Sequence, residues 1–183
     1  APVCSAAQLG VALCPCSGTA DPTAYAAAVD AAASALSGDP RVVVDRLRDR
    51  MFELAANQRF EEAATTRDRL STLLGAVRRH LLVDALRSAE RAEVSFGDST
   101  WIIDRGRLID ATRIGAPGRA LPVPPPEAST AAVLSRDQID EALCLARFCD
   151  KRADRLAVSC SGTWAFPIGD RLSELAALVN RAA

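Results

Sequence analysis

Residues 41–77 carry two stripes of apolar side chains at the spacing of an α-helix, and this pattern constrains the fold of the chain most strongly. At about 100° per residue, the members of each stripe fall on one helix face. The polar residues Asn57, Gln58 and Arg59 separate the stripes. The sequence therefore predicts an antiparallel helical hairpin. The first stripe comprises Val43, Val44, Leu47, Met51, Leu54 and Ala55, and the second comprises Phe60, Ala63, Ala64, Leu70, Leu74 and Val77.

Small side chains flank the predicted turn and allow the two helix backbones to approach closely. They are Ala55, Ala56, Ala63 and Ala64, and we expect Phe60 to fill the space beside them.

Arg67 projects within the second stripe, between Ala63, Ala64 and Leu70. A buried guanidinium without a partner costs too much free energy to be tolerated. Two interpretations follow. Arg67 lies at the edge of the hairpin and extends to water, or Arg67 and Asp68 face an equivalent hairpin on another chain.

An ordered set of residues gives the hairpin a family resemblance. The set is Met51, Ala55-Ala56, Phe60-Glu61, Ala63-Ala64, Arg67-Asp68, Leu70 and Leu73. It resembles the UVR motif, a helical hairpin shared by the excision-repair proteins UvrB and UvrC. UVR hairpins of this family associate with each other, so the resemblance implies a UvrB-like protein or another UVR hairpin as partner. The residues expected to contact that partner are Phe60, Glu61, Ala64, Arg67 and Asp68.

The charge balance argues against strong direct binding of DNA. The net charge of the 183-residue chain is -1, whereas proteins that hold DNA by neutralising phosphates are usually strongly basic. Residues 41–80 hold nine arginines against six acidic residues, with the two signs interspersed. We therefore expect contact with DNA through the parent protein.

No apolar run approaches the roughly 20 residues that span a bilayer, and no charged leader with an apolar segment is present. A cytoplasmic location is expected. The chain begins with Ala1 instead of methionine, so we expect a mature or an excised product.

The N-terminal cysteines carry a second resemblance. Cys4 and the run Cys14-Pro15-Cys16-Ser17-Gly18 precede a predicted helix that begins at Asp21-Pro22, contains Tyr25 and Val29, and ends near Gly38. A cysteine-rich segment of this kind precedes the UVR hairpin in UvrC-like proteins. There it is associated with an iron-sulfur cluster held by four cysteines.

This resemblance implies an iron-sulfur cluster at Cys4, Cys14 and Cys16, and zinc is equally compatible with three thiolates. A fourth ligand would come from Cys144, Cys149 or Cys160. The chain departs from the family at Ala12, where a cysteine is usual, and another family cysteine would lie before Ala1. Two alternatives stay open: the cysteines bind no metal and act as small core residues, or the six cysteines form disulfides, which a chain of this size does not need.

The remaining residues predict a small mixed α/β domain. Strands are expected at 93–96, 100–103 and 107–110, followed by an extended Pro-rich connection at 115–126. A helix capped by Ser135 and Gln138 runs to about Lys151, a hairpin joins 156–160 to 163–166, and Asp170 caps a last helix through Val179.

The predicted fold class is thus α+β. An N-terminal helical segment with the UVR hairpin is followed by the mixed domain with its antiparallel hairpins. The expected domains are 1–38, 39–89 and 90–183.

The residues disfavour catalysis within this chain. His80 is the one histidine, Tyr25 is the one tyrosine, and no Gly-rich phosphate loop is present. The C-terminal half resembles the tail of bacterial, especially actinobacterial, proteins that fuse a DnaQ-like exonuclease to a UvrC-like or Cho-like GIY-YIG nuclease. The resemblance implies a non-catalytic partner-binding or scaffold portion of a DNA-repair nuclease. The alternatives are a UVR-containing adaptor of a Clp-type quality-control system, whose usual Cys-x-x-Cys pairs are absent here, and a free-standing enzyme.

Overall fold

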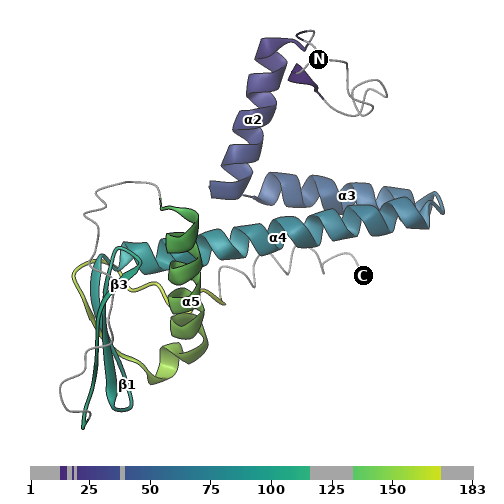
Figure 1. The fold of residues 1–183 in the computed structure, drawn as a ribbon. Coiled ribbons are helices and arrows are strands. Elements are labelled where there is room, and N and C mark those ends of the chain that lie inside the picture. Colours follow the sequence, from purple (N-terminus) through teal and green to yellow (C-terminus); the bar gives the residue numbers. More distant parts are fainter. Residues whose placement is uncertain (1–12, 16–17, 19, 38–39, 116–133, 170–183) are drawn as a thin grey trace. The chain divides into compact units, whose positions relative to one another are not determined.

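A computed structural model describes residues 13–15, 18, 20–37, 40–115 and 134–169 (Figure 1). Its contacts divide the chain into two compact units, Ala1–Leu73 and Leu74–Ala183. The division falls within one long helix. The described elements confirm the α+β class, with helices first and an antiparallel sheet after them.

The first unit begins with helix α2 (Pro22–Ser37). The Asp21 carboxylate accepts hydrogen bonds from the backbone N–H groups of Thr23 at 3.0 Å and Ala24 at 3.3 Å. These bonds satisfy two donors that the first turn of a helix leaves unpaired. The predicted helix start at Asp21-Pro22 is therefore confirmed.

The hairpin predicted at residues 41–77 is present. Helix α3 (Arg41–Ala56) and helix α4 (Phe60–Ser88) run in opposite directions on either side of a three-residue turn (Figure 1). Val44 and Leu54 of α3 are buried, as are Ala63, Thr66 and Leu70 of α4. These residues form the inner side of the hairpin.

The turn closes through a Schellman motif. The N–H of Arg59 donates to the Leu54 carbonyl, and the N–H of Gln58 donates to the Ala55 carbonyl, both at 2.9 Å. Gln58 occupies the left-handed position with φ of 61°, where glycine is most common. The Asn57 side chain also donates to the Glu53 carbonyl at 2.9 Å. The last turn of α3 thus finds its hydrogen-bond partners inside the turn.

The second unit contains a four-stranded antiparallel sheet in the order β3-β2-β1-β4. The three-stranded meander predicted after residue 90 is confirmed. Its turns contain Gly97 with φ of 61°, and Arg105 and Gly106 with φ of 46° and 90°. Such left-handed pairs suit two-residue hairpins. The strands are β1 (Arg91–Phe96), β2 (Ser99–Asp104), β3 (Arg107–Arg113) and β4 (Ala157–Cys160).

Helix α5 (Arg136–Arg152) follows the sheet meander and continues into the short 3-10 helix η2 (Ala153–Arg155). Its predicted capping box is present. The Gln138 N–H donates to Ser135 Oγ at 3.4 Å, and the Ser135 N–H donates to Gln138 Oε1 at 2.9 Å. Reciprocal bonds of this kind fix where a helix begins.

The hairpin predicted from 156–160 and 163–166 is wrong in its second strand. Residues 157–160 form β4 and pair with β1, but residues 163–166 adopt no strand. The reason lies in where the backbone donors go: the N–H of Gly162 bonds to the Ala89 carbonyl at 3.1 Å, and that of Thr163 bonds to the Ser88 carbonyl at 2.8 Å. The end of α4 thus takes the donors that a second strand would need. The last predicted helix, 170–179, and residues 116–126 lie outside the described residues.

The core of the second unit joins the end of α4 to the sheet and α5. Its most deeply buried side chains include Leu82 and Leu86 from α4, Val94 and Ile103 from the sheet, and Cys149 from α5. None of the described helices is long and apolar enough to cross a membrane.

Replacing Gly162 by alanine tests the contact between the chain after β4 and the end of α4. A Cβ atom at Gly162 would overlap the Ser88 carbonyl oxygen and lie 3.0 Å from the Ala89 carbonyl carbon. Backbone atoms cannot move aside as side-chain ends do, so we expect Gly162→Ala to lower the free energy of unfolding by about 2 kcal/mol or more. Urea denaturation followed by circular dichroism measures this change.

Gly169→Ala is the matched control. A Cβ at Gly169 meets no atom within 4 Å, so its effect should stay within about 0.5 kcal/mol. Equal unfolding midpoints for the two variants would contradict the packing described for Gly162.

Candidate functional site

The residues predicted to contact a partner lie along one stripe at the start of α4. Helical geometry places Phe60, Ala64, Arg67 and Asp68 within about 100° of one another around the axis, with Glu61 at the edge of the stripe. Phe60, Glu61, Arg67 and Asp68 are exposed and Ala64 is half-buried. The inner side of the hairpin, formed by Ala63, Thr66 and Leu70, lies on another part of the helix surface.

The expectation that Phe60 fills space beside the small residues of the turn is wrong. Its surface is 66% exposed. Phe60 is the first residue of α4 and lies about 80° around the helix from buried Leu70. The Schellman turn draws the backbone close without help from a large side chain, so the ring projects into solvent.

Arg67 extends to water, which is the first of the two interpretations drawn from the sequence. Its side chain is 67% exposed and that of Asp68 is 69% exposed. The guanidinium donates to Asp68 Oδ1 from Nε at 3.1 Å and from Nη2 at 2.9 Å. The two residues therefore present a positive and a negative group side by side on the surface.

Other charges of the hairpin pair within their own helix. Arg48 lies 2.9 Å from both Asp45 and Asp49, and Arg50 lies 2.7 Å from Glu53. The hydrogen bond that Arg48 donates to Asp49 raises the pKa of Arg48 above its usual value, and the charges of Asp49 and Asp45 add to this effect. Exposed pairs of this kind contribute little to stability.

The predicted metal ligands are described only at Cys14, which is 8% exposed. Cys4 and Cys16 lie outside the described residues. Among the residues that the structure describes, no three histidine, cysteine or acidic side chains gather in a metal-binding group. The cysteines among the described residues form no disulfide: Cys14, Cys144, Cys149 and Cys160.

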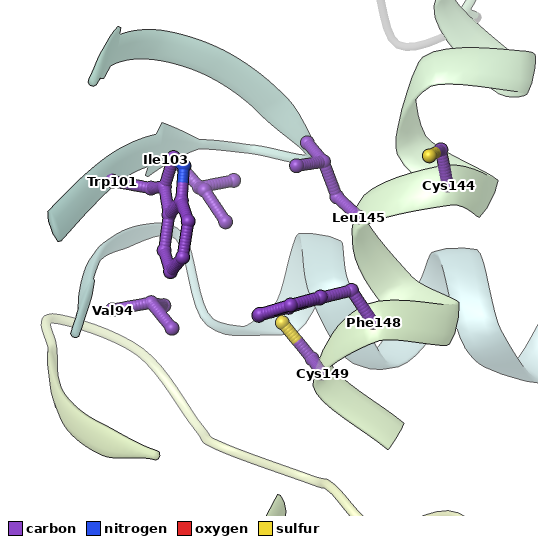
Figure 2. Close-up of a pocket in the computed structure, with 7 residues that line it drawn as sticks. All are labelled: Val94, Trp101, Ile103, Cys144, Leu145, Phe148 and Cys149. Atoms are coloured by element: carbon purple, nitrogen blue, oxygen red, sulfur yellow. The ribbon is translucent and has the colours of Figure 1, made fainter. Parts of the chain in front are cut away.

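An apolar pocket that the sequence analysis missed lies between the sheet and α5 (Figure 2). It has a volume of about 170 Å³. Trp101 from β2 and Phe148 from α5 meet edge to face there, with ring centroids 5.2 Å apart. The lining is apolar apart from the Trp101 indole and the two cysteine thiols. The lining residues are Val94, Trp101, Ile103, Cys144, Leu145, Phe148 and Cys149.

The two cysteines of this pocket differ in their environment. Cys144 is exposed, whereas Cys149 is 1% exposed. Burial, and to a smaller extent the nearby charge of Asp150, raises the pKa of the Cys149 thiol to about 12. The thiolate is the nucleophile and the metal ligand, so Cys149 is inert near neutral pH.

Alkylation at pH 8 should therefore separate Cys144 from Cys149. We expect iodoacetamide to label Cys144 within minutes and to leave Cys149 unlabelled until the chain is unfolded, because an unfolded thiol regains a pKa of about 8.5. The folded state holds the proton of the Cys149 thiol to a higher pH than the unfolded state does. The contribution of Cys149 to the free energy of unfolding is therefore complete below about pH 8.5 and declines as the pH rises toward 12. Peptide mass spectrometry measures both labels, and equal native rates would contradict the described burial.

The hairpin matches the model of a known protein family. The family model described as the UvrB/uvrC motif (UVR) matches residues 41–74, from the start of α3 into α4. The UvrABC system protein C of Haloquadratum walsbyi is 37% identical over 70 residues, which is 38% of this chain and 12% of that protein. The protein of the same name from Natronomonas pharaonis is 41% identical over 66 residues, covering 36% of this chain and 12% of that protein.

A bacterial relative extends the similarity beyond the hairpin. The UvrABC system protein C of Geobacter metallireducens is 36% identical over 107 residues, which is 56% of this chain and 17% of that protein. The alignments thus span less than a fifth of the length of these three relatives. No solved structure matches the chain. The chain therefore carries a UVR motif and is similar to UvrC proteins over that motif and the residues around it.

Proposed function

We propose that this chain is a partner-binding portion of a UvrC-like DNA-repair nuclease, and that its α3–α4 hairpin binds a second UVR hairpin, such as that of a UvrB-like protein. The observation that carries the proposal is the exposure of Phe60 within the segment that matches the UVR motif. In this proposal catalysis belongs to other parts of the parent nuclease.

An exposed aromatic ring at the end of a hairpin favours a protein contact. Phe60 is 66% exposed, and burying a phenylalanine side chain is worth about 1.5–3 kcal/mol. The inner side of the hairpin, formed by residues such as Leu54 and Leu70, is already closed without it. Burial of Phe60 in a partner would therefore add to the free energy of binding without disturbing the fold.

The charged pair beside Phe60 suits a partner of the same kind. Arg67 and Asp68 lie 2.9 Å apart on one exposed stripe. A second hairpin with the same pair can place its carboxylate opposite Arg67 and its guanidinium opposite Asp68, because a two-fold interface is self-complementary. Ala64, between Phe60 and Arg67 on the stripe, leaves room for the second helix to approach.

The relatives favour the repair role over a Clp-type adaptor, since those reported above are UvrC proteins. The origin of the parent in an actinobacterial fusion of a DnaQ-like exonuclease with a GIY-YIG nuclease stays a prediction from the sequence.

Substitution of Phe60 tests the proposed contact. We expect Phe60→Ala to weaken binding of a UvrB-like protein by at least about 10-fold, because buried aromatic anchors dominate interface energies. The free energy of unfolding of the variant should lie within about 0.5 kcal/mol of that of the original chain, since the ring is exposed in the free protein. Isothermal titration calorimetry measures the first quantity and urea denaturation the second.

Phe52→Ala is the control, because Phe52 of α3 is also exposed, at 37%. The proposal places the contact on α4, so this variant should bind within about 3-fold of the original chain. Loss of binding in Phe52→Ala with full binding in Phe60→Ala would move the contact to α3. Absence of binding by the original chain to any UVR hairpin, its own included, would remove the proposal.

A metal site at Cys4, Cys14 and Cys16 is a separate proposal. It is supported by the resemblance of the N-terminal segment to UvrC-like proteins and by the burial of Cys14, since a buried thiolate is protected from solvent when it binds an iron-sulfur cluster or zinc. The metal would organise the segment before α2.

Metal analysis of the purified chain tests this site. We expect anaerobically purified protein to contain iron or zinc, and Cys14→Ser to lose most of it, because a hydroxyl is a poor substitute for a thiolate ligand. Cys144→Ser, Cys149→Ser and Cys160→Ser, measured one at a time, identify the fourth ligand, because two of these three variants should retain the metal. Elemental analysis and the visible absorption spectrum measure both, and metal-free original protein would end the proposal.

A further inference from the structure

Four basic side chains lie along the last turns of α5 and in η2. They are Arg147, Lys151 and Arg152 of α5 and Arg155 of η2, and we call them the α5 basic cluster. Ion pairs of the second unit include Arg78 with Asp150 and Arg113 with Asp98. Within the described residues, no member of the cluster forms an ion pair with an acidic side chain.

Asp150, which is next to Lys151 in the sequence, is hydrogen-bonded to groups outside the cluster. Asp150 accepts a hydrogen bond from the Ile168 N–H at 2.9 Å and another from Arg78 at 3.4 Å, and its side chain is only 14% exposed. Asp154 is exposed and accepts no hydrogen bond in the described part of the chain. The cluster therefore keeps a local excess of positive charge on a chain whose net charge is -1.

Two of the three guanidinium groups of the cluster lie on aromatic rings. The Arg152 Cζ lies 4.6 Å from the Phe148 ring centroid and 5.5 Å from that of Phe96, and the Arg155 Cζ lies 5.2 Å from that of Phe96. The two rings meet edge to face with centroids 5.7 Å apart. A guanidinium stacked on a ring has its flat face covered by the ring. Its N–H groups point outward from the edge and can donate to an anion.

The helix end explains only part of this arrangement. Cations near the C-terminus of a helix are favoured by its dipole, and this accounts for Lys151 and Arg152. It does not account for Arg155, which follows the helix and shares the Phe96 ring with Arg152. Two like charges held on one ring repel each other at low ionic strength, and a bound anion would relieve that repulsion.

We propose that the α5 basic cluster binds phosphate groups of a single nucleic-acid strand. From Arg147 to Arg155 the cluster extends about 12 Å, which is enough for a few phosphates. Arginine donates well to phosphate oxygens, and bases of a single strand stack on arginine and aromatic planes such as those around Phe96. This surface is distinct from the UVR hairpin and does not depend on its proposed role.

Two triple variants with the same net charge test the proposal. Arg147→Ala/Lys151→Ala/Arg155→Ala removes three exposed members of the cluster and leaves Arg152 on its rings. Arg46→Ala/Arg50→Ala/Arg69→Ala removes three exposed arginines of the hairpin. Each variant lowers the net charge by three, from -1 to -4. The probe is a fluorescein-labelled 20-nucleotide oligo-dT, titrated by fluorescence anisotropy at several salt concentrations.

We expect the original chain to bind this probe with a Kd of about 1–100 µM at 50 mM NaCl. The cluster variant should bind at least about 10-fold more weakly, and its log-log salt slope should be less negative by about 2, since each lost phosphate contact contributes about 0.7. The hairpin variant should stay within about 3-fold of the original chain. Thermal melts establish that both variants are folded, and the double variant Arg147→Ala/Lys151→Ala provides a second measure.

Three results would overturn the proposal. The first is no binding by the original chain at 50 mM NaCl. The second is equal weakening in the two triple variants, which would assign the effect to overall charge. The third is equally strong binding of a polyglutamate peptide with the same number of charges, which would make the cluster a site for an acidic protein segment.

Discussion

One helix buries two different sides of itself, and both units depend on that constraint. In the unit up to Leu73, α4 buries the side that carries Ala63 and Leu70, whereas in the second unit it buries Leu82 and Leu86. At 100° per residue, Leu82 and Leu86 fall outside the side of the helix that carries Ala63 and Leu70. The change of side falls near the point where the contacts divide the chain. A helix with one continuous apolar stripe would not serve both cores.

The local parts of this fold were predictable because their signals are short-range. Alternation and turn residues located the meander from β1 to β3, and Ser135 with Gln138 located the start of α5. The second strand after β4 was not predictable in this way. Its backbone donors bond to carbonyls at Ser88 and Ala89, more than seventy residues earlier, and no periodicity in residues 163–166 reports so distant a partner.

The residues of the candidate site came from the motif and stay a prediction, whereas the exposure of Phe60 was missed. The motif identified Phe60, Arg67 and Asp68, but it did not show that the Phe60 ring faces solvent, because exposure at a helix end depends on how the turn closes. The α5 basic cluster escaped notice for another reason. Its members count as ordinary surface charges until tertiary structure brings Phe96 beside the end of α5.

The Schellman turn has a consequence for recognition at the end of α3. The carbonyls of Glu53, Leu54 and Ala55 already accept hydrogen bonds from within the turn. These acceptors are therefore already occupied when a partner protein binds. The partner must distinguish this end of α3 by the side chains of the helix. Related hairpins with the same backbone can then differ in which protein they choose through a few surface substitutions, while the turn itself stays unchanged.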